Sequence, residues 1–498
     1  MLEQNALEKD VPRQRNIGKE LIASARQAVV QHDELIAVLI FVIHVYVDWY
    51  LGLAFSAQFI TMGLLLVFFL IRSPERPWVR PQNLWLWIVF LLLALFPMVR
   101  GYTLRDGVYF YVNSLFNALL VFWLALLVAQ DIASVRRLFK MLAIVATLLA
   151  IHTIIEARTG ILLFRTARFD TTVNGPLSFP LGKTGIIRAE SFMLNPDANG
   201  GFFAFMLLLP LGLFLDSSSW REKVLYLVEI LLMALALLFT YTTGAWLALG
   251  AGVVAFAIFA GTIRYRVQIA AIFLVSLLAI IAIFPTQIYR LVQHATATNE
   301  WTLRFGVWQT ALRVISAFPL TGIGLGRSVY FIRAQPYRVR AQNVPVYHPH
   351  NSFLEMTALG GIPLGLMFLA LLMLACWYAL RNWRQMDKSA HSLLGGGLAA
   401  VVSLTFFSLS NAGWTLTPLL AGGWLILGAI ASPLLLQNRW GSKGAVWQEE
   451  TVPIAAITAQ GQNESAASRA VWQEETVPTT VVTAERKFQG RNENSAQR

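Results

Sequence analysis

Cysteine is almost absent from this chain of 498 residues, which has Cys376 alone. A single cysteine excludes an intramolecular disulfide and any cysteine-based metal site. Charge is scarce as well, because charged residues make up 13% of the sequence while hydrophobic residues make up 56%. The mean hydropathy of +0.58 is too high for one soluble core of this length. The composition therefore predicts an all-α, polytopic membrane protein.

Apolar runs long enough to cross a bilayer recur along the chain, and they predict about 12 transmembrane helices between residues 34 and 436. Residues 1–33 lack the hydrophobic core of a signal peptide, so the first span is expected to serve as an uncleaved anchor. Residues 437–498 are polar and contain the nonapeptide AVWQEETVP twice, which predicts a disordered tail. The predicted spans lie near residues 34–52, 55–71, 83–99, 108–129, 138–157, 199–215, 224–241, 244–262, 268–284, 354–380, 391–411 and 416–436.

The basic residues of the short loops predict the orientation. They fall on one side of the predicted spans, which places that side and both termini in the cytoplasm. The two long loops, 158–198 and 285–353, are then extracytoplasmic. The net charge of +12 is divided among these loops, so a nucleic-acid-binding face is not indicated. The marker residues are Arg72, Arg76, Arg80, Arg136, Arg137, Lys140, Arg221, Lys223, Arg264, Arg266, Arg381, Arg384, Lys388, Arg439 and Lys443.

Lysine is missing from residues 285–350, which hold seven arginines and a single acid, Glu300. The guanidinium group offers a planar fork of donors that matches phosphate oxygens two at a time, whereas lysine is a hydrated point charge. The loop closes on His348-Pro349-His350-Asn351, and histidine can accept a proton near neutral pH. This composition favours a phosphate-binding site beside a proton acceptor.

Within the same loop, Trp301–Phe318 predicts an amphipathic helix at the membrane surface, with Arg304 and Trp308 one turn apart. Leu320–Gly326 (LTGIGLG) follows as a glycine turn. It is not interpreted as a dinucleotide loop, because no strand of a βαβ unit precedes it. The other long loop closes on Arg188–Asp197 (RAESFMLNPD) at the start of a span.

The order of three motifs resembles the O-antigen ligase and O-antigen polymerase superfamily, over roughly residues 34–436. The motifs are Arg-x-x-x-Phe-x-x-Asn-Pro from Arg188, Leu-Arg-Phe-x-x-Trp from Leu303 leading into the glycine turn, and His-Pro-His-Asn-Ser-Phe-Leu from His348 followed by GGIPLG. The resemblance implies a GT-C-type glycosyltransferase that uses a glycan on undecaprenyl diphosphate. In the ligase branch, which we favour, the acceptor is the lipid A core oligosaccharide of lipopolysaccharide. One departure is Tyr241–Ala245, where many members carry an arginine.

The resemblance and the chemistry together assign roles to six residues. The leaving diphosphate gains negative charge, which arginines can stabilise without a metal or other cofactor. The acceptor hydroxyl must lose a proton to a base, and direct attack inverts the anomeric carbon. Scattered external carboxylates do not indicate a metal site. We expect His350 as the base, Arg188 and Arg304 as diphosphate binders, and His348, Asn351 and Trp308 in support.

Alternatives remain open at this point. His350 is also placed to cap the following helix, for which Asn351 or Ser352 is a natural N-cap, and both arginines could reach lipid phosphates. The alternative acceptor is a second lipid-linked glycan, as in an O-antigen or exopolysaccharide polymerase. A lipid-linked sugar transporter is less favoured, because transporters concentrate charge within the membrane. Outside the loops, the ionisable residues weighed as side candidates are His44, Asp48, Glu156 and Glu229.

Overall fold

The structure, a computed structural model, describes most of the predicted transmembrane region. These residues belong to one compact unit, Met1–Trp440, and the second unit, Gly441–Arg498, lies outside them. The predictions for the N-terminal segment, the repeated tail and most of loop 158–198 therefore fall outside the described residues. The described ranges are 33–47, 62–65, 67–69, 78–159, 179–180, 187–193, 195–260, 263–297, 300–342 and 345–437.

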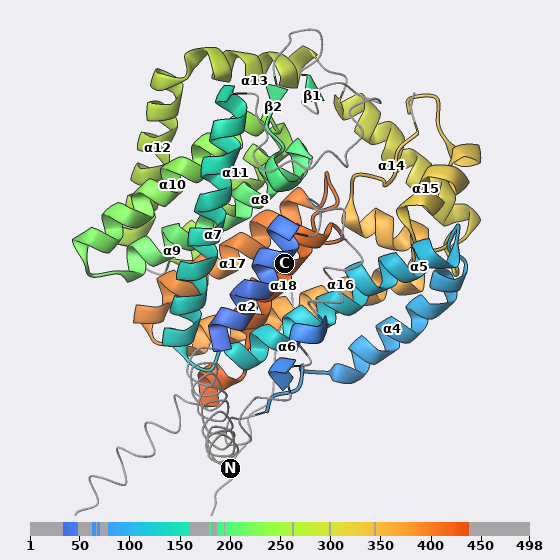
Figure 1. Ribbon diagram of the computed structural model, residues 1–498, viewed down its shortest axis with the longest axis horizontal. Coiled ribbons are helices and arrows are strands. Elements are labelled where there is room, and N and C mark those ends of the chain that lie inside the picture. Colours follow the sequence, from blue (N-terminus) through green and yellow to red (C-terminus); the bar gives the residue numbers. More distant parts are fainter. Residues whose placement is uncertain are drawn as a thin grey trace, which may run out of the picture. The chain divides into compact units, whose positions relative to one another are not determined.

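Helices account for nearly all of the described chain (Figure 1). Two two-residue strands pair antiparallel, with Phe179 opposite Arg188. The transmembrane region begins with α2 (Asp33–Val42), η1 (Ile43–Val47), α4 (Leu84–Val99), α5 (Leu104–Phe110), η2 (Tyr111–Phe116), α6 (Asn117–Val128) and α7 (Ile132–Thr159). It continues with β1 (Phe179–Pro180), β2 (Ile187–Arg188), η4 (Ser191–Met193), α8 (Pro196–Met206), α9 (Leu208–Asp216), α10 (Trp220–Thr240), α11 (Thr243–Phe259) and α12 (Ile263–Ile283). The remainder is α13 (Pro285–Ala297), α14 (Glu300–Ala317), α15 (Arg327–Arg333), η5 (Gln335–Tyr337), α16 (Ser352–Gln385), η6 (Lys388–Ala390), α17 (His391–Phe407) and α18 (Thr417–Ala431).

Eight helical segments within the described residues are long and apolar enough to cross a membrane. They make this a multi-pass membrane protein. Leu84–Val99 and Thr243–Phe259 are shorter apolar helices at two further predicted positions. The first two predicted spans are described only in part, so the total of twelve stays a prediction. One segment, Leu104–Val128, is interrupted by the π-helical turn η2, which the apolar pattern did not indicate.

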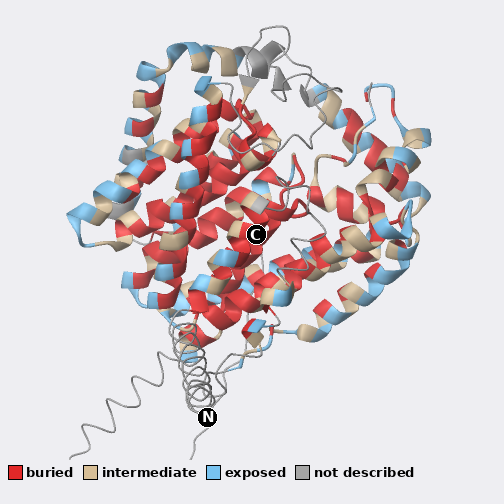
Figure 2. Cartoon of the chain, in the orientation of Figure 1, coloured by how far each residue is buried: buried red, intermediate tan, exposed pale blue. Residues whose placement is uncertain are grey.

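The centre of the bundle is formed by α8, α17 and α18, where buried residues are concentrated in Figure 2. Every residue of α18 is buried, as expected for a helix that is apolar on all sides. Small residues allow close approach, because a Cβ added to Gly212 of α9 would lie 3.1 Å from the Cα atom of Gly396 in α17. The helices α4 and α12 instead expose apolar side chains such as Phe96 and Val275, which suits contact with lipid.

The two ends of the bundle differ in their polar groups. The end where α7 begins, α9 ends and α10 begins carries five of the basic residues that predicted a cytoplasmic face, Arg136, Arg137, Lys140, Arg221 and Lys223. The helix α7 has 28 residues and is about 42 Å long at 1.5 Å per residue. The other end of the bundle, where α8, α11, α16 and α18 begin, is therefore well separated from the end where α7 begins. Three ion pairs mark the first end: Arg136–Asp216 at 2.5 Å, Arg137–Glu34 at 2.5 Å and Lys140–Glu222 at 2.7 Å.

The glycine turn docks on a break in α16. Gly361 has a φ of 84° and Pro363 has no amide hydrogen, so the carbonyls of Ala358 and Leu359 lack their usual helical donors. The amides of Ile323 and Gly324 donate to these two carbonyls, each at 3.0 Å. The glycine turn thus supplies the hydrogen-bond donors that the break in α16 leaves missing. These bonds also fix the loop that follows α14 to a membrane helix.

Gly322, Gly324 and Gly326 all have positive φ, which confirms that this segment is a tight turn. The preceding helix, α14, also matches its prediction closely in extent. Val307 and Ala311 are buried on one face of this helix, and α14 packs against α16.

Candidate active site

The segment around Arg188 is held by two membrane helices. The amide of Ala189 donates to the Phe239 carbonyl of α10 at 3.0 Å. The carboxylate of Glu156 on α7 accepts hydrogen bonds from the amides of Glu190 at 3.1 Å and Ser191 at 2.7 Å. Glu156, a side candidate for chemistry from the sequence, is therefore a positioning residue for the Arg188 segment.

Arg188 is fixed by three interactions on one side of the site. Its Nη2 atom lies 2.5 Å from Oδ1 of Asp197 and 3.1 Å from Oγ1 of Thr242, and Nε donates to the Thr240 carbonyl at 2.9 Å. The Asp197 carboxylate itself sits in the first turn of α8. Asn195 caps that helix by accepting hydrogen bonds from the amides of Asp197 at 2.8 Å and Ala198 at 3.0 Å. The sequence predicted Arg188 at this position, but it did not indicate that its charge is compensated.

Asn351 is the cap of α16, and this settles which residue begins that helix. Its Oδ1 atom accepts hydrogen bonds from the amides of Phe353 at 2.9 Å and Leu354 at 3.0 Å. Its Nδ2 atom donates to the Leu409 carbonyl at 2.9 Å, which ties the cap to the loop after α17. The capping role that the sequence left open for His350 therefore belongs to its neighbour.

His350 has a φ of 50°, a left-handed conformation that is uncommon outside glycine. Its amide donates to Nδ1 of His348 at 3.1 Å, and the two rings lie 4.3 Å apart. The pKa of His348 lies well below 6.5, because burial disfavours the charged ring and because His350 and Arg327 add positive charge nearby. His348 is thus a neutral acceptor that orients the backbone of His350.

Arg304 approaches the same place from α14. Its Nη1 atom donates to the Ser410 carbonyl at 2.7 Å, and that bond is to a neutral group. Space for it is left by Gly244, where an added Cβ would lie 3.6 Å from the same Nη1 atom. Trp308 follows one turn later and packs edge-on against Phe305, with ring centroids 5.3 Å apart. Among the described residues, the buried indole nitrogen of Trp308 has no hydrogen-bond partner.

Electrostatic interactions join these groups into one cluster. The Asp197 carboxylate interacts with Arg188, Arg304 and His350. His348 interacts with His350, Arg327, Asp197 and Arg304. The structure therefore brings together Arg188, Arg304, His348 and His350, beside the cap Asn351. Three segments far apart in the sequence meet at one end of the helix bundle.

Arg327 is one of the seven loop arginines, and the sequence did not single it out. It begins α15 and contributes to the electrostatics of His348. Arg338 and Arg340 are exposed, whereas Arg333 has a structural role. Its Nη1 atom donates to the carbonyls of Arg100 at 2.6 Å and Ile323 at 2.7 Å. The spacing of the arginines along the chain could not distinguish these roles. The role of each arginine depends on which other segments its side chain contacts in the folded protein.

The intramembrane side candidates do not join the cluster. His44 is buried, with Nδ1 2.7 Å from the Ile40 carbonyl and Nε2 accepting from Nδ2 of Asn117 at 2.8 Å. Both ring nitrogens are satisfied within the bundle, which is a structural role. Glu229 is buried in α10, and Asp48 lies outside the described residues. No group of three or more His, Cys, Asp or Glu side chains with metal-binding geometry occurs within the described part of the chain.

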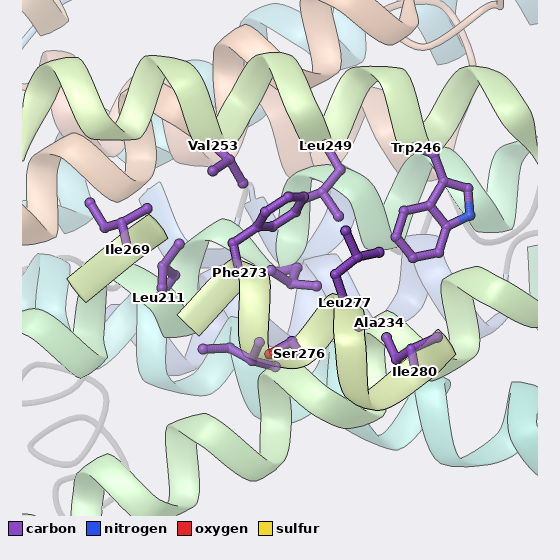
Figure 3. A pocket seen from close by; sticks show the side chains of 12 residues that line it. Leu211, Ala234, Trp246, Leu249, Val253, Ile269, Phe273, Ser276, Leu277 and Ile280 are labelled. Atoms are coloured by element: carbon purple, nitrogen blue, oxygen red, sulfur yellow. The ribbon is translucent and has the colours of Figure 1, made fainter. Parts of the chain in front are cut away.

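A separate apolar cavity of about 30 Å³ lies between α9, α10, α11 and α12 (Figure 3). Leu249, Phe273 and Ile280 are among its lining residues, and Trp246 stands at one end of the view. Apolar cavities of this size stay dry. It is therefore a gap in helix packing, with none of the groups needed for sugar transfer.

The fold and the site define a class: a multi-pass membrane protein with an arginine and histidine cluster at one end of its helices. Residues 229–369 match the family described as O-antigen ligase. The matched stretch contains Arg304, the glycine turn and His350, whereas Arg188 and Asp197 precede it. A comparison with curated proteins found no match. The family match supports a glycosyltransferase-like activity of the ligase or polymerase type.

Proposed function

We propose that the protein is an O-antigen ligase, which transfers a glycan from undecaprenyl diphosphate to the lipid A core oligosaccharide at the periplasmic face of the bacterial inner membrane. The observation that carries this proposal is the meeting of Arg304, Arg188 and the His348–His350 pair at one end of the bundle. The family match over residues 229–369 supports the donor class. The reaction is proposed to be metal-independent, inverting and of the GT-C type.

The two arginines have different surroundings and are proposed to act differently. Arg304 donates to a neutral carbonyl, so its positive charge is not offset by a paired carboxylate in that contact. Charge developing on the leaving diphosphate is stabilised by such a preorganised donor. Arg188 is already paired with Asp197 and anchored to Thr240. It would bind the diphosphate more weakly and mainly shape that side of the site.

His350 is the proposed base. It accepts the proton of the acceptor hydroxyl as that oxygen bonds to the anomeric carbon, while the bond from that carbon to the diphosphate oxygen breaks. Asp197 is the other candidate in the cluster, but its carboxylate is engaged by Arg188. Imidazole also changes its protonation near neutral pH, where a base is most effective.

The test uses the purified full chain in lipid nanodiscs with a glycan on undecaprenyl diphosphate. One reaction receives lipid A core as acceptor, a second receives only further lipid-linked glycan, and both are repeated with EDTA. We expect the core to be extended, with or without EDTA. Extension of the lipid-linked glycan alone would instead identify a polymerase, and loss of activity with EDTA would contradict the metal-independent reaction. Movement of the lipid-linked glycan across the bilayer without transfer would identify a transporter.

A further inference from the structure

A small polar pocket lies beside the candidate active site, between α5, η2, the start of α15 and the start of α18. Its volume is about 70 Å³, and Asp106, Tyr109, Asn113, Arg327 and Thr417 are among the residues that line it. By this measure a single water needs about 10–15 Å³, so the pocket has room for several waters or for a small chemical group such as one edge of a sugar ring.

Asn113 is the most informative side chain in the pocket. It is 2% exposed, and neither its amide nitrogen nor its amide oxygen has a hydrogen-bond partner among the described residues. The carboxylate of Asp106, in contrast, is hydrogen-bonded by Ser328 and by the Val329 amide at the start of α15. A buried amide with no partner for either of its polar atoms is destabilising, so Asn113 indicates a missing ligand or water. Asn113 also lies in η2, a π-helical turn, and such turns occur often at functional sites.

The charges of the lining residues restrict what the pocket can hold. The guanidinium group of Arg327 disfavours a metal cation, and the carboxylate of Asp106 disfavours phosphate. An amide, a carboxylate, a guanidinium and a threonine hydroxyl together provide both donors and acceptors for a neutral group. Sugar hydroxyls both donate and accept, and Tyr109 adds an aromatic wall of the kind that binding pockets use. A neutral polyol fits these groups better than an ion or an apolar chain does.

Two connections join the pocket to the reaction centre. Arg327 lines the pocket and also contributes to the electrostatics of His348. Thr415 lines it as well, and its hydroxyl donates to Oε2 of Glu355 at 2.5 Å. Glu355 lies in the first turn of α16, the helix that Asn351 caps directly after His350. The pocket and the proposed base are thus attached to the same helix start.

We propose that this pocket is a subsite that binds one hydroxyl-bearing edge of a substrate sugar and so helps to select the glycan. This rests on the proposed function for the identity of the substrate. Asn113 supplies a donor and an acceptor to neighbouring hydroxyls, and Thr417 supplies a further hydroxyl contact. The sugar belongs either to the donor glycan or to the acceptor, and both present the same chemistry.

The test measures binding without turnover. Wild-type protein in nanodiscs is titrated by calorimetry with two free oligosaccharides: the core oligosaccharide released from lipid A, and the repeat unit of the donor glycan. Asn113→Leu removes the amide at similar volume, and Thr417→Val removes the hydroxyl. Thr357→Val is the matched control, because Thr357 donates only to the Phe353 carbonyl of its own helix and does not line the pocket.

We expect one oligosaccharide to bind at least about tenfold more weakly to both pocket variants and equally well to the Thr357→Val protein. The oligosaccharide that responds identifies the sugar as donor or acceptor. If neither affinity changes in either pocket variant, the pocket holds water only and the proposal is overturned.

Transfer assays separate this proposal from the proposed function. Suppose that the wild-type protein transfers glycan and that Asn113→Leu does not change oligosaccharide binding. This outcome would support the ligase function and contradict the proposed subsite. Conversely, binding that depends on Asn113 in a protein that transfers no glycan would keep the subsite and overturn the ligase. An analogue of the responding oligosaccharide that lacks the bound hydroxyl should bind wild type and Asn113→Leu equally.

Discussion

The backbone amide of His350 donates to Nδ1 of His348 across 3.1 Å, so that one histidine uses its ring to hold the main chain of the other. The donor is a backbone N–H, and Nδ1 must therefore be unprotonated. This leaves His350 in a left-handed conformation that the pair itself helps to maintain. Five predictions follow from the geometry around this pair.

Replacing His350 distinguishes the role of its imidazole as a base from the effect of its left-handed backbone conformation on folding. Asparagine tolerates positive φ better than most residues and glycine adopts it freely, so His350→Asn and His350→Gly should both fold. Transfer should fall by about 10²- to 10⁴-fold in both, as expected for the loss of a general base. The assay is glycan transfer at saturating donor, with thermal unfolding as the measure of folding. A well-folded His350→Gly protein with wild-type rates would eliminate the proposed base.

Arg304→Lys keeps a positive charge but loses the planar fork. We expect transfer to fall by about 10- to 100-fold, because a lysine cannot make paired contacts to the diphosphate and hold Ser410 at the same time. Arg313 is exposed on the same helix, so Arg313→Lys is the matched control and should retain activity. Equal activity in the two variants would show that Arg304 contributes charge alone.

The Arg188–Asp197 pair is suited to a double-mutant cycle. Removing one partner leaves the charge of the other unpaired. We therefore expect Arg188→Ala and Asp197→Ala each to destabilise the protein by about 1–3 kcal/mol. The double variant should be more stable than the sum of the two single changes predicts, since neither charge is left alone. Thermal unfolding in detergent supplies the comparison, and strictly additive effects would mean that the ion pair contributes no coupling.

Acid should destabilise the site through His348. Its pKa is lower in the folded protein than in the unfolded chain, so the unfolded chain binds the proton more readily. The contribution of His348 to stability is therefore complete above about pH 6.5 and is lost as the pH falls toward the lowered folded pKa. His348→Asn keeps an acceptor near Nδ1 and cannot titrate. Its unfolding temperature should fall less than that of wild type between pH 7.5 and pH 5.5, and an identical fall would assign the acid sensitivity elsewhere.

The docking of the glycine turn is tested at Gly361. An added Cβ would lie 2.5 Å from the backbone of Leu320, and the φ of 84° already disfavours a side chain. Gly361→Ala should lower both stability and transfer, with a cost of about 1–3 kcal/mol. Gly250→Ala is the control, because no atom lies within 4 Å of the added Cβ and alanine favours the helix. Normal transfer by Gly361→Ala would show that the turn tolerates displacement from α16.

Much of this arrangement could be predicted from local sequence. Apolar runs gave the positions of the long membrane helices, and the glycines of residues 320–326 gave the turn. The resemblance to the O-antigen ligase and O-antigen polymerase superfamily singled out Arg188, Arg304 and His350 as one site. The helices and the turn depend on composition, periodicity and neighbouring residues, which a single chain displays directly.

The partners of those residues could not be predicted in the same way. The contacts from Glu156 to the Ser191 amide and from Arg304 to the Ser410 carbonyl join residues 35 and 106 positions apart. Which residues meet over such separations is decided by helix packing. The sequence alone therefore did not distinguish Arg327 from the other arginines of the loop, because its neighbours are set by this packing. The π-helical turn at Asn113 was also missed, because one extra residue in a turn leaves the apolar pattern of the span almost unchanged.

The break in α16 also has a mechanical consequence. Ile362 donates its amide to the Pro319 carbonyl, while Ala358 and Leu359 accept from the other side of the turn. The chain after α14 is thus fastened both before and after the break in α16. A change in the bend of α16 at this break would therefore move the end of α14, the helix that carries Arg304.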